Sequence, residues 1–154
     1  HGLDCAILFR RPNIESTDRA IERIRSVKMG TLVAAGRDAP LKLAEALQKG
    51  QHVAMLVDQY MGNGVEVTFF GRKTKANPTL ARLLRQVDCP VHGVRIIRLP
   101  NHRFRAELSE EVKPVRDAEG QIDVQGTMQA VTSVIEGWVR EYPVQWLWLH
   151  RRWR

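Results

Sequence analysis

The sequence contains only two cysteines among its 154 residues, and neither belongs to a pairing or metal-binding pattern. Cys5 and Cys89 each lie in or beside an apolar stretch, with no Cys-x-x-Cys or Cys/His spacing around them. The sequence therefore predicts two structural thiols in a reducing compartment rather than a disulfide or a zinc site. We expect neither a metal nor another cofactor.

Long apolar runs are also missing. No stretch approaches the roughly 20 residues that a helix needs to cross a bilayer, and no segment has the pattern of a signal peptide. Any contact with a membrane is therefore expected to be peripheral, or to involve a segment outside this sequence.

Several familiar catalytic motifs are absent as well. The sequence has no serine nucleophile elbow, no HExxH and no GxGxxG, so hydrolase, zinc protease and dehydrogenase functions lack support. The five histidines are scattered, and none has a convincing catalytic partner in the sequence. Residues 62–64 (GNG) are able to cradle a phosphate, but without a following Lys-Ser/Thr a plain flexible loop is the stronger prediction.

Positive charge, by contrast, is in excess. Lys and Arg number 24 against 17 Asp and Glu, which gives a formal net charge of +7. An anionic partner is therefore favoured: a nucleic acid, a phosphorylated lipid or an acidic carrier protein. Aromatic residues make up only 6% of the chain and gather at its C-terminus, which argues against the interleaved stacking platforms of nucleic-acid-binding proteins.

The first third of the chain alternates between strand and helix patterns. Strands are predicted at 3–9, 31–34 and 52–57, with helices at 14–28 and 39–49 between them. Asp38 is the expected cap of the second helix, with Leu41, Leu43 and Leu47 facing inward. The continuous apolar run 53–57 predicts a strand covered on both faces, and the alternation predicts a parallel sheet within an α/β fold.

The rest of the chain is predicted to complete one domain. We expect a strand at 64–70, a basic connector at 72–75, a helix from Asn77 to Val87, a hairpin of strands at 89–99 and 103–108, a loop at 110–121 and a helix at 124–140. Because 44% apolar content is enough for a core, residues 1–154 should form a single α/β domain with a mostly parallel mixed sheet flanked by helices.

Polar residues follow each of the first three predicted strands. Arg10 and Arg11 come after the first, Arg37 after the second, and Asp58 with Gln59 after the third. Parallel strands end at the same edge of a sheet, where α/β proteins bind ligands, so these side chains are expected in one crevice. The arginines suit bidentate phosphate contact. Asp58 is equally well interpreted as a general acid or base or as a structural acid paired with an arginine.

Two aromatic groups admit a structural and a functional interpretation. Phe69 and Phe70 are consecutive strand residues, so one of them must face away from the core and is able to line an apolar groove. Trp146, Trp148 and Trp153 alternate with Leu and end beside arginines, which fits either a packed C-terminal segment or an anchor at a membrane interface.

Five stretches together resemble the bacterial lipid A biosynthesis acyltransferases, the lauroyl/myristoyl enzymes of the lysophospholipid and glycerolphosphate acyltransferase superfamily. They are RRPN at 10–13, LVDQ at 56–59, VTFFGRK at 67–73, CPV at 89–91 and REYPVQWLWLHRRW at 140–153. The resemblance runs through nearly the whole chain in the family's order, and the last signature is the most specific.

The resemblance implies transfer of a fatty acyl group from acyl carrier protein, or a similar thioester, to a hydroxyl of a phosphorylated lipid A precursor. The expected place is the cytoplasmic face of the bacterial inner membrane, and the expected form is a monomer. By match to the family's blocks, Arg11 and Arg37 bind the acceptor's phosphates, Asp58 is a supporting acid of the substrate site, and Phe69, Phe70, Gly71 and Pro90 border the acyl groove.

The sequence departs from the family at one decisive point. Such enzymes use a His-x-x-x-x-Asp/Glu motif whose histidine deprotonates the acceptor hydroxyl. His1 and Asp4 have the wrong spacing for it. We therefore expect the chain to be the C-terminal part of a longer protein, with the catalytic histidine outside it and no turnover alone. A basic nucleic-acid-binding domain and a non-catalytic module for anionic lipids remain the alternatives.

Overall fold

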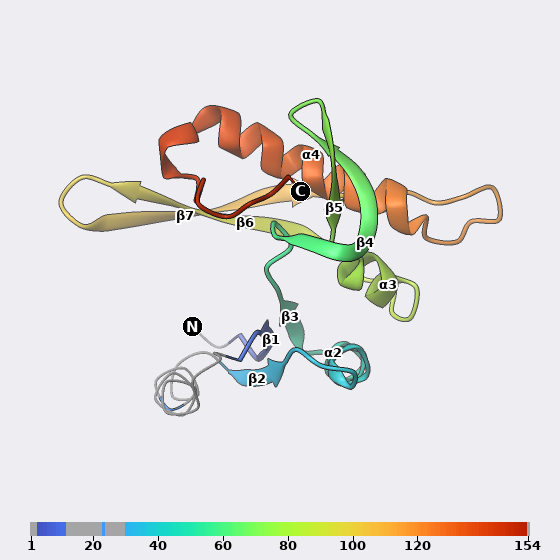
Figure 1. The fold of residues 1–154 in the computed structure, drawn as a ribbon. Coiled ribbons are helices and arrows are strands. Elements are labelled where there is room, and N and C mark those ends of the chain that lie inside the picture. The colour runs from blue at the N-terminus through green and yellow to red at the C-terminus, as the bar shows by residue number, and fades with distance from the viewer. Residues whose placement is uncertain (1–2, 12–22, 24–29, 154) are drawn as a thin grey trace. The chain divides into compact units, whose positions relative to one another are not determined.

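The computed structural model describes residues 3–11, 23 and 30–153, and these form two compact units, His1–Leu56 and Val57–Arg154 (Figure 1). Each unit is described by itself below. Most of the helix predicted at 14–28 lies outside the described residues, and the single domain predicted for 1–154 stays a prediction.

The first unit is built on a parallel sheet. Strand β1 (Cys5–Phe9) lies in the middle, between β2 (Thr31–Ala34) and β3 (His52–Ala54), and it runs parallel to both. Helix α2 (Ala39–Gln48) follows β2 and buries Leu43, while Ala6 and Val33 of the sheet are also buried. The predicted strand–helix–strand alternation and the parallel pairing are therefore confirmed for the described residues.

Two details of the first unit correct the predictions. Leu41 is 63% exposed instead of facing inward, because α2 buries Ala39, Leu43 and Ala46, and a residue two positions from 39 and 43 lies on the opposite face. Asp38 stands at the N-terminus of α2, but its side chain makes no capping hydrogen bond.

Strand β3 is shorter and less buried than predicted. It ends at Ala54, its residues alternate between exposed and half-buried, and Leu56 is 76% exposed. The reason lies in the strand order, since among the described residues β3 pairs only with β1 and is the outermost strand on its side of the sheet. An apolar run of five residues was therefore not evidence of a central strand.

The second unit begins with an antiparallel hairpin. Strands β4 (Tyr60–Phe69) and β5 (Arg72–Ala76) are joined by the two-residue turn Phe70-Gly71, in which both residues have positive φ, 51° and 70°. Two consecutive residues of this kind define the turn that best matches the twist of a hairpin. The predictions of a loop at 62–64 and a connector at 72–75 were wrong. In β5, the buried Thr74 and Ala76 alternate with exposed basic residues. This is the alternation of a strand, but the charged residues make it hard to recognise in the sequence.

Gly64 lies where β4 shifts register against β5, and it is required there. A Cβ atom at Gly64 would lie 2.1 Å from the carbonyl oxygen of Ala76, whereas one at Gly62 would meet only Tyr60 Oη at 3.7 Å. We expect Gly64→Ala to lower the free energy of unfolding by about 1–3 kcal/mol because the strands must separate. Gly62→Ala is the matched control and should stay within about 0.5 kcal/mol in urea unfolding. Equal effects would show that Gly64 is not a point of close approach.

The remaining elements agree with the predicted order. Helix α3 (Thr79–Leu84) is capped by Asn77, whose Oδ1 accepts the Thr79 N–H at 3.0 Å. Strands β6 (His92–Leu99) and β7 (Arg103–Glu111) form an antiparallel hairpin, and helix α4 (Val124–Glu141) follows, with Asp123 as its cap. The short 3-10 helix η1 (Pro143–Gln145) begins the C-terminal segment.

The α/β class is thus confirmed, whereas a single mostly parallel mixed sheet is only partly borne out. Among the described residues, parallel pairing is confined to β1–β3, and the second unit holds two separate antiparallel hairpins. Helix α4 packs on β4 and supplies much of the second core (Figure 1). The buried members of this core are Val67, Phe69, Ala76, Ala81, Leu84, Ile122, Met128, Val131, Ile135 and Val139.

Candidate functional site

The parallel sheet of the first unit brings two arginine-bearing strand ends to one edge. Phe9 of β1 lies beside Ala34 of β2, and the Ala35 N–H donates to the Phe9 carbonyl at 2.7 Å. Arg10 and Arg11 follow β1 directly, Arg37 follows β2 in the turn before α2, and all three are exposed. The structure therefore places these arginines at the same carboxyl edge of the sheet, which is where α/β proteins generally bind their ligands.

Asp58 and Gln59 belong to the second unit, in the link between β3 and β4. Asp58 is half-buried and Gln59 is exposed. Asp58 interacts electrostatically with Arg152, a residue that is 98% buried. Burial lowers the pKa of Arg152, and the Asp58 carboxylate opposes part of this shift. The predicted convergence of Asp58 with Arg11 and Arg37 stays a prediction.

The C-terminal segment holds the strand that follows Asp58, a role that the sequence analysis missed. His150 Nε2 accepts the backbone N–H of Tyr60 at 3.1 Å, so this ring carries its proton on Nδ1 when the bond is made. Arg152 donates to the carbonyl of Lys75 at 2.7 Å, and the Arg152 carbonyl accepts from the Thr74 hydroxyl. Sequence periodicity gives no sign of contacts between residues so far apart. The only sequence signal for His150 and Arg152 was the HRRW stretch.

Phe69 and Phe70 have different surroundings. Phe69 is fully buried and stacks on Trp153 with ring centroids 5.5 Å apart, while Trp146 lies 6.0 Å away. Phe70 is half-buried under the guanidinium of Arg140, and its N–H donates to Glu136 at 2.6 Å. This hydrogen bond, together with Arg140, lowers the pKa of Glu136. Gly71 is exposed at the turn, so Phe70 and Gly71 are accessible to solvent, whereas the acyl groove itself stays a prediction.

The three tryptophans of the predicted membrane interface also separate. Trp146 and Trp153 are half-buried against the core, and Trp153 donates its indole N–H to the Phe69 carbonyl at 3.1 Å. Trp148 is 53% exposed and donates its indole N–H to the Pro143 carbonyl at 2.7 Å. The packed-segment interpretation therefore describes Trp146 and Trp153, and only Trp148 offers its ring to the surroundings.

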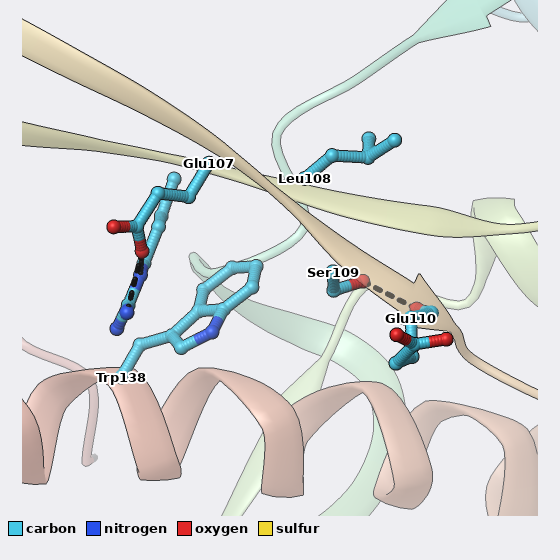
Figure 2. Close-up of a pocket in the computed structure, with 6 residues that line it drawn as sticks. Glu107, Leu108, Ser109, Glu110 and Trp138 are labelled. Carbon is cyan, nitrogen blue, oxygen red and sulfur yellow. Dashed lines mark hydrogen bonds and ion pairs between the residues drawn. The ribbon is translucent and has the colours of Figure 1, made fainter.

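A polar pocket of about 310 Å³ lies between β7 and α4 (Figure 2). Trp138 rises toward it from α4, and Leu108 points away on the other side of the strand. Arg95 pairs there with Glu107 and Glu141, and its guanidinium stacks on Trp138 and Tyr142. The Glu141 hydrogen bond raises the pKa of Arg95. The charge of Arg95 is already neutralised by two carboxylates. The cluster therefore connects β6 to α4 rather than binding an external anion.

The sequence analysis overlooked one match to the His-x-x-x-x-Glu spacing, at His102 and Glu107. His102 lies at the tip of the β6–β7 hairpin with φ 55°, whereas Glu107 lies within β7 and bonds Arg95 and Arg105. The four steps from Arg103 to Glu107 extend about 13 Å along the strand, so the carboxylate is too far away to orient the imidazole. The spacing is present, but an extended strand does not bring the two groups together.

Other candidate residues carry less chemistry. Pro90 is exposed before β6, beside the half-buried Cys89, and both cysteines are unpaired with pKa values raised first by burial. Within the described part of the chain, no group of three or more His, Cys, Asp or Glu residues is placed to hold a metal ion. No helix among the described residues is long and apolar enough to span a membrane.

A parallel sheet with exposed arginines at its carboxyl edge defines the first unit as that of an α/β protein. Comparison with protein families makes the assignment specific: the family described as bacterial lipid A biosynthesis acyltransferase matches residues 1–154. The chain therefore belongs to this family, as the sequence motifs predicted, and membership implies acyl transfer to a lipid A precursor. A search of curated proteins found no match.

Proposed function

We propose that this chain takes part in transferring a fatty acyl group from acyl carrier protein, or a similar thioester, to a hydroxyl of a phosphorylated lipid A precursor. The observation that carries the proposal is the family match along all 154 residues. The reaction is proposed to occur at the cytoplasmic face of the bacterial inner membrane. The net charge of +7 supports both an acidic carrier protein and a phosphorylated acceptor as partners.

The acceptor's phosphates are proposed to bind at the arginine edge, defined as Arg10, Arg11 and Arg37. These three exposed cations lie at one edge of the sheet, and a guanidinium matches a phosphate with two parallel hydrogen bonds. Asp58 and Gln59, in the second unit, are proposed as further substrate-binding residues. The Asp58 carboxylate interacts electrostatically with the buried Arg152.

The acyl chain is proposed to contact Phe70, Gly71 and Pro90, with Phe69 as the buried support beneath the turn. Phe70 is half-buried, whereas Gly71 and Pro90 are exposed, so each of them is accessible to a ligand. Each methylene removed from water contributes about 0.8 kcal/mol, which is enough for a long chain to dominate donor binding.

The general base is proposed to lie outside these 154 residues. His102 matches the motif spacing, but the β7 strand separates it from Glu107, and Glu107 is engaged by Arg95 and Arg105. An imidazole without an orienting carboxylate is a poor base for an acceptor hydroxyl. On this proposal the chain binds substrates, and a preceding His-x-x-x-x-Asp/Glu segment supplies the proton transfer.

The test is an acyl-transfer assay with a radiolabelled acyl carrier protein thioester and a phosphorylated lipid A precursor. The chain alone should give no transfer above background, and a version extended by the upstream coding residues should transfer the label. Transfer by the chain alone that is lost in His102→Ala would overturn the assignment of the base. If the extended version binds the precursor but transfers nothing, the protein is a non-catalytic lipid-binding module.

A further inference from the structure

Apolar side chains are concentrated and exposed in residues 144–149, directly after α4. Val144 is 91% exposed, Leu147 68%, Trp148 53% and Leu149 90%. Single exposed apolar residues are ordinary, but four within six consecutive positions are a feature that soluble surfaces avoid. We call residues 144–149 the apolar segment.

The apolar segment is firmly held. The Gln145 side chain accepts the Arg98 N–H at 2.8 Å and donates to the Arg98 carbonyl at 3.2 Å, which ties the segment to the edge of β6. The backbone N–H groups of Gln145, Trp146 and Trp148 donate to carbonyls within residues 142–146. The indole N–H of Trp148 is also satisfied. N–H groups that already donate to protein carbonyls enter an apolar phase at little cost, because they do not depend on water for a hydrogen bond.

Positive charge borders the apolar segment. The backbone of Arg98 is bonded to Gln145, and Arg151 follows the segment directly; both arginines are exposed. Among the described residues no carboxylate forms an ion pair with either of them, and Glu107 and Glu141 are engaged by Arg95. Apolar side chains flanked by unneutralised arginines are complementary to a bilayer surface with anionic headgroups.

We propose that the apolar segment, with Arg98 and Arg151, is the surface through which this protein binds an anionic lipid bilayer. Leu147, Trp148 and Leu149 enter the boundary between headgroups and acyl chains, and the arginines contact lipid phosphates. The inference rests on the proposed function for the presence of a membrane and adds the surface that meets it. Trp146 and Trp153 take no part, because their rings pack on Phe69.

The experiment measures co-sedimentation of the full chain with vesicles containing phosphatidylglycerol and with vesicles of phosphatidylcholine alone. Binding is expected to the first and to be much weaker to the second. Leu147→Glu combined with Leu149→Glu should weaken binding by about tenfold or more. The change replaces two leucines that would enter the bilayer with negative charges that the anionic surface repels. Leu41→Glu, at an exposed leucine of α2, is the matched control and should bind as the unaltered chain does.

Trp148 supplies an independent readout. Vesicles should shift the tryptophan fluorescence of the chain to the blue, and Trp148→Phe should abolish the shift while leaving sedimentation nearly unchanged. The altered leucine side chains are exposed, so thermal unfolding monitored by circular dichroism should not change in the leucine variants.

Two results would overturn the proposal. One is equal vesicle binding by the double leucine variant and the unaltered chain. The other is self-association, or binding to a protein partner, that the double variant abolishes while lipid binding persists. Neither measurement contains an acyl donor or an acceptor, so loss of acyl transfer and loss of membrane binding are distinguished.

Discussion

Replacing Phe69 with alanine is expected to lower the free energy of unfolding of the second unit by about 3–5 kcal/mol. Phe69 is fully buried, and its ring is surrounded by Phe70, Trp146, Trp153 and the guanidinium of Arg152. The loss combines the transfer free energy of the ring with the cavity that these large neighbours leave when they relax only partly. Such a change is a large fraction of a typical stability of 5–15 kcal/mol.

Tryptophan fluorescence during urea unfolding measures this effect selectively, because all four tryptophans lie in residues 138–153 of the second unit. The matched control is Phe104→Ala in β7, the same chemical change at a side chain that is 62% exposed. It should cost about 1 kcal/mol or less. Similar losses in the two variants would contradict the central position of Phe69.

The same ring explains how the C-terminal segment is attached. Trp153 stacks on Phe69 and donates to its carbonyl, and Arg152 is buried between the ring and the carbonyl of Lys75. His150 then receives the Tyr60 N–H. The last residues of the chain therefore support the hairpin that begins just after Asp58. A loss of packing at Phe69 should also loosen the position of Asp58.

Periodicity predicted the elements whose cores are local. The α4 stripe of Met128, Val131 and Ile135 is buried as its 3.6-residue spacing requires, and Asn77 caps α3 through a contact two residues away. Strand β5 was missed because its exposed lysines and arginine conceal the alternation of Thr74 and Ala76. The strand predicted at 64–70 corresponds to β4, but its start at Tyr60 and its antiparallel pairing with β5 were not predicted.

The site was predictable to the extent that topology determines it. Parallel strands end together, so the positions of Arg11 and Arg37 at one edge followed from the strand–helix alternation. The contacts of Arg152 and His150 were not predictable, because they depend on where a segment without regular structure folds back on a hairpin some 80 to 90 positions earlier. A motif match such as His102 and Glu107 is equally uninformative until the strand between its members is known.

Loss of Arg11 or of Arg37 at the arginine edge is expected to weaken binding of a phosphorylated lipid A precursor by about 10- to 100-fold. The range follows from the roughly 1.5–3 kcal/mol that a hydrogen bond to a charged group contributes. Arg11→Ala and Arg37→Ala remove cations that follow neighbouring parallel strands, so both should weaken binding and reduce its dependence on salt. Isothermal titration with the precursor in detergent micelles measures the affinity directly.

The control for charge alone is Lys49→Ala. Lys49 ends α2 just before β3, whose first residue His52 pairs with Cys5 at the start of β1, so this exposed lysine lies at the opposite edge of the same sheet. Removing it lowers the net charge by the same amount and should change affinity less than about twofold, because a distant exposed charge is screened by salt. If all three variants bind alike, the strand ends do not form the phosphate site. If only the two arginine variants weaken, the carboxyl edge of the sheet holds the phosphates.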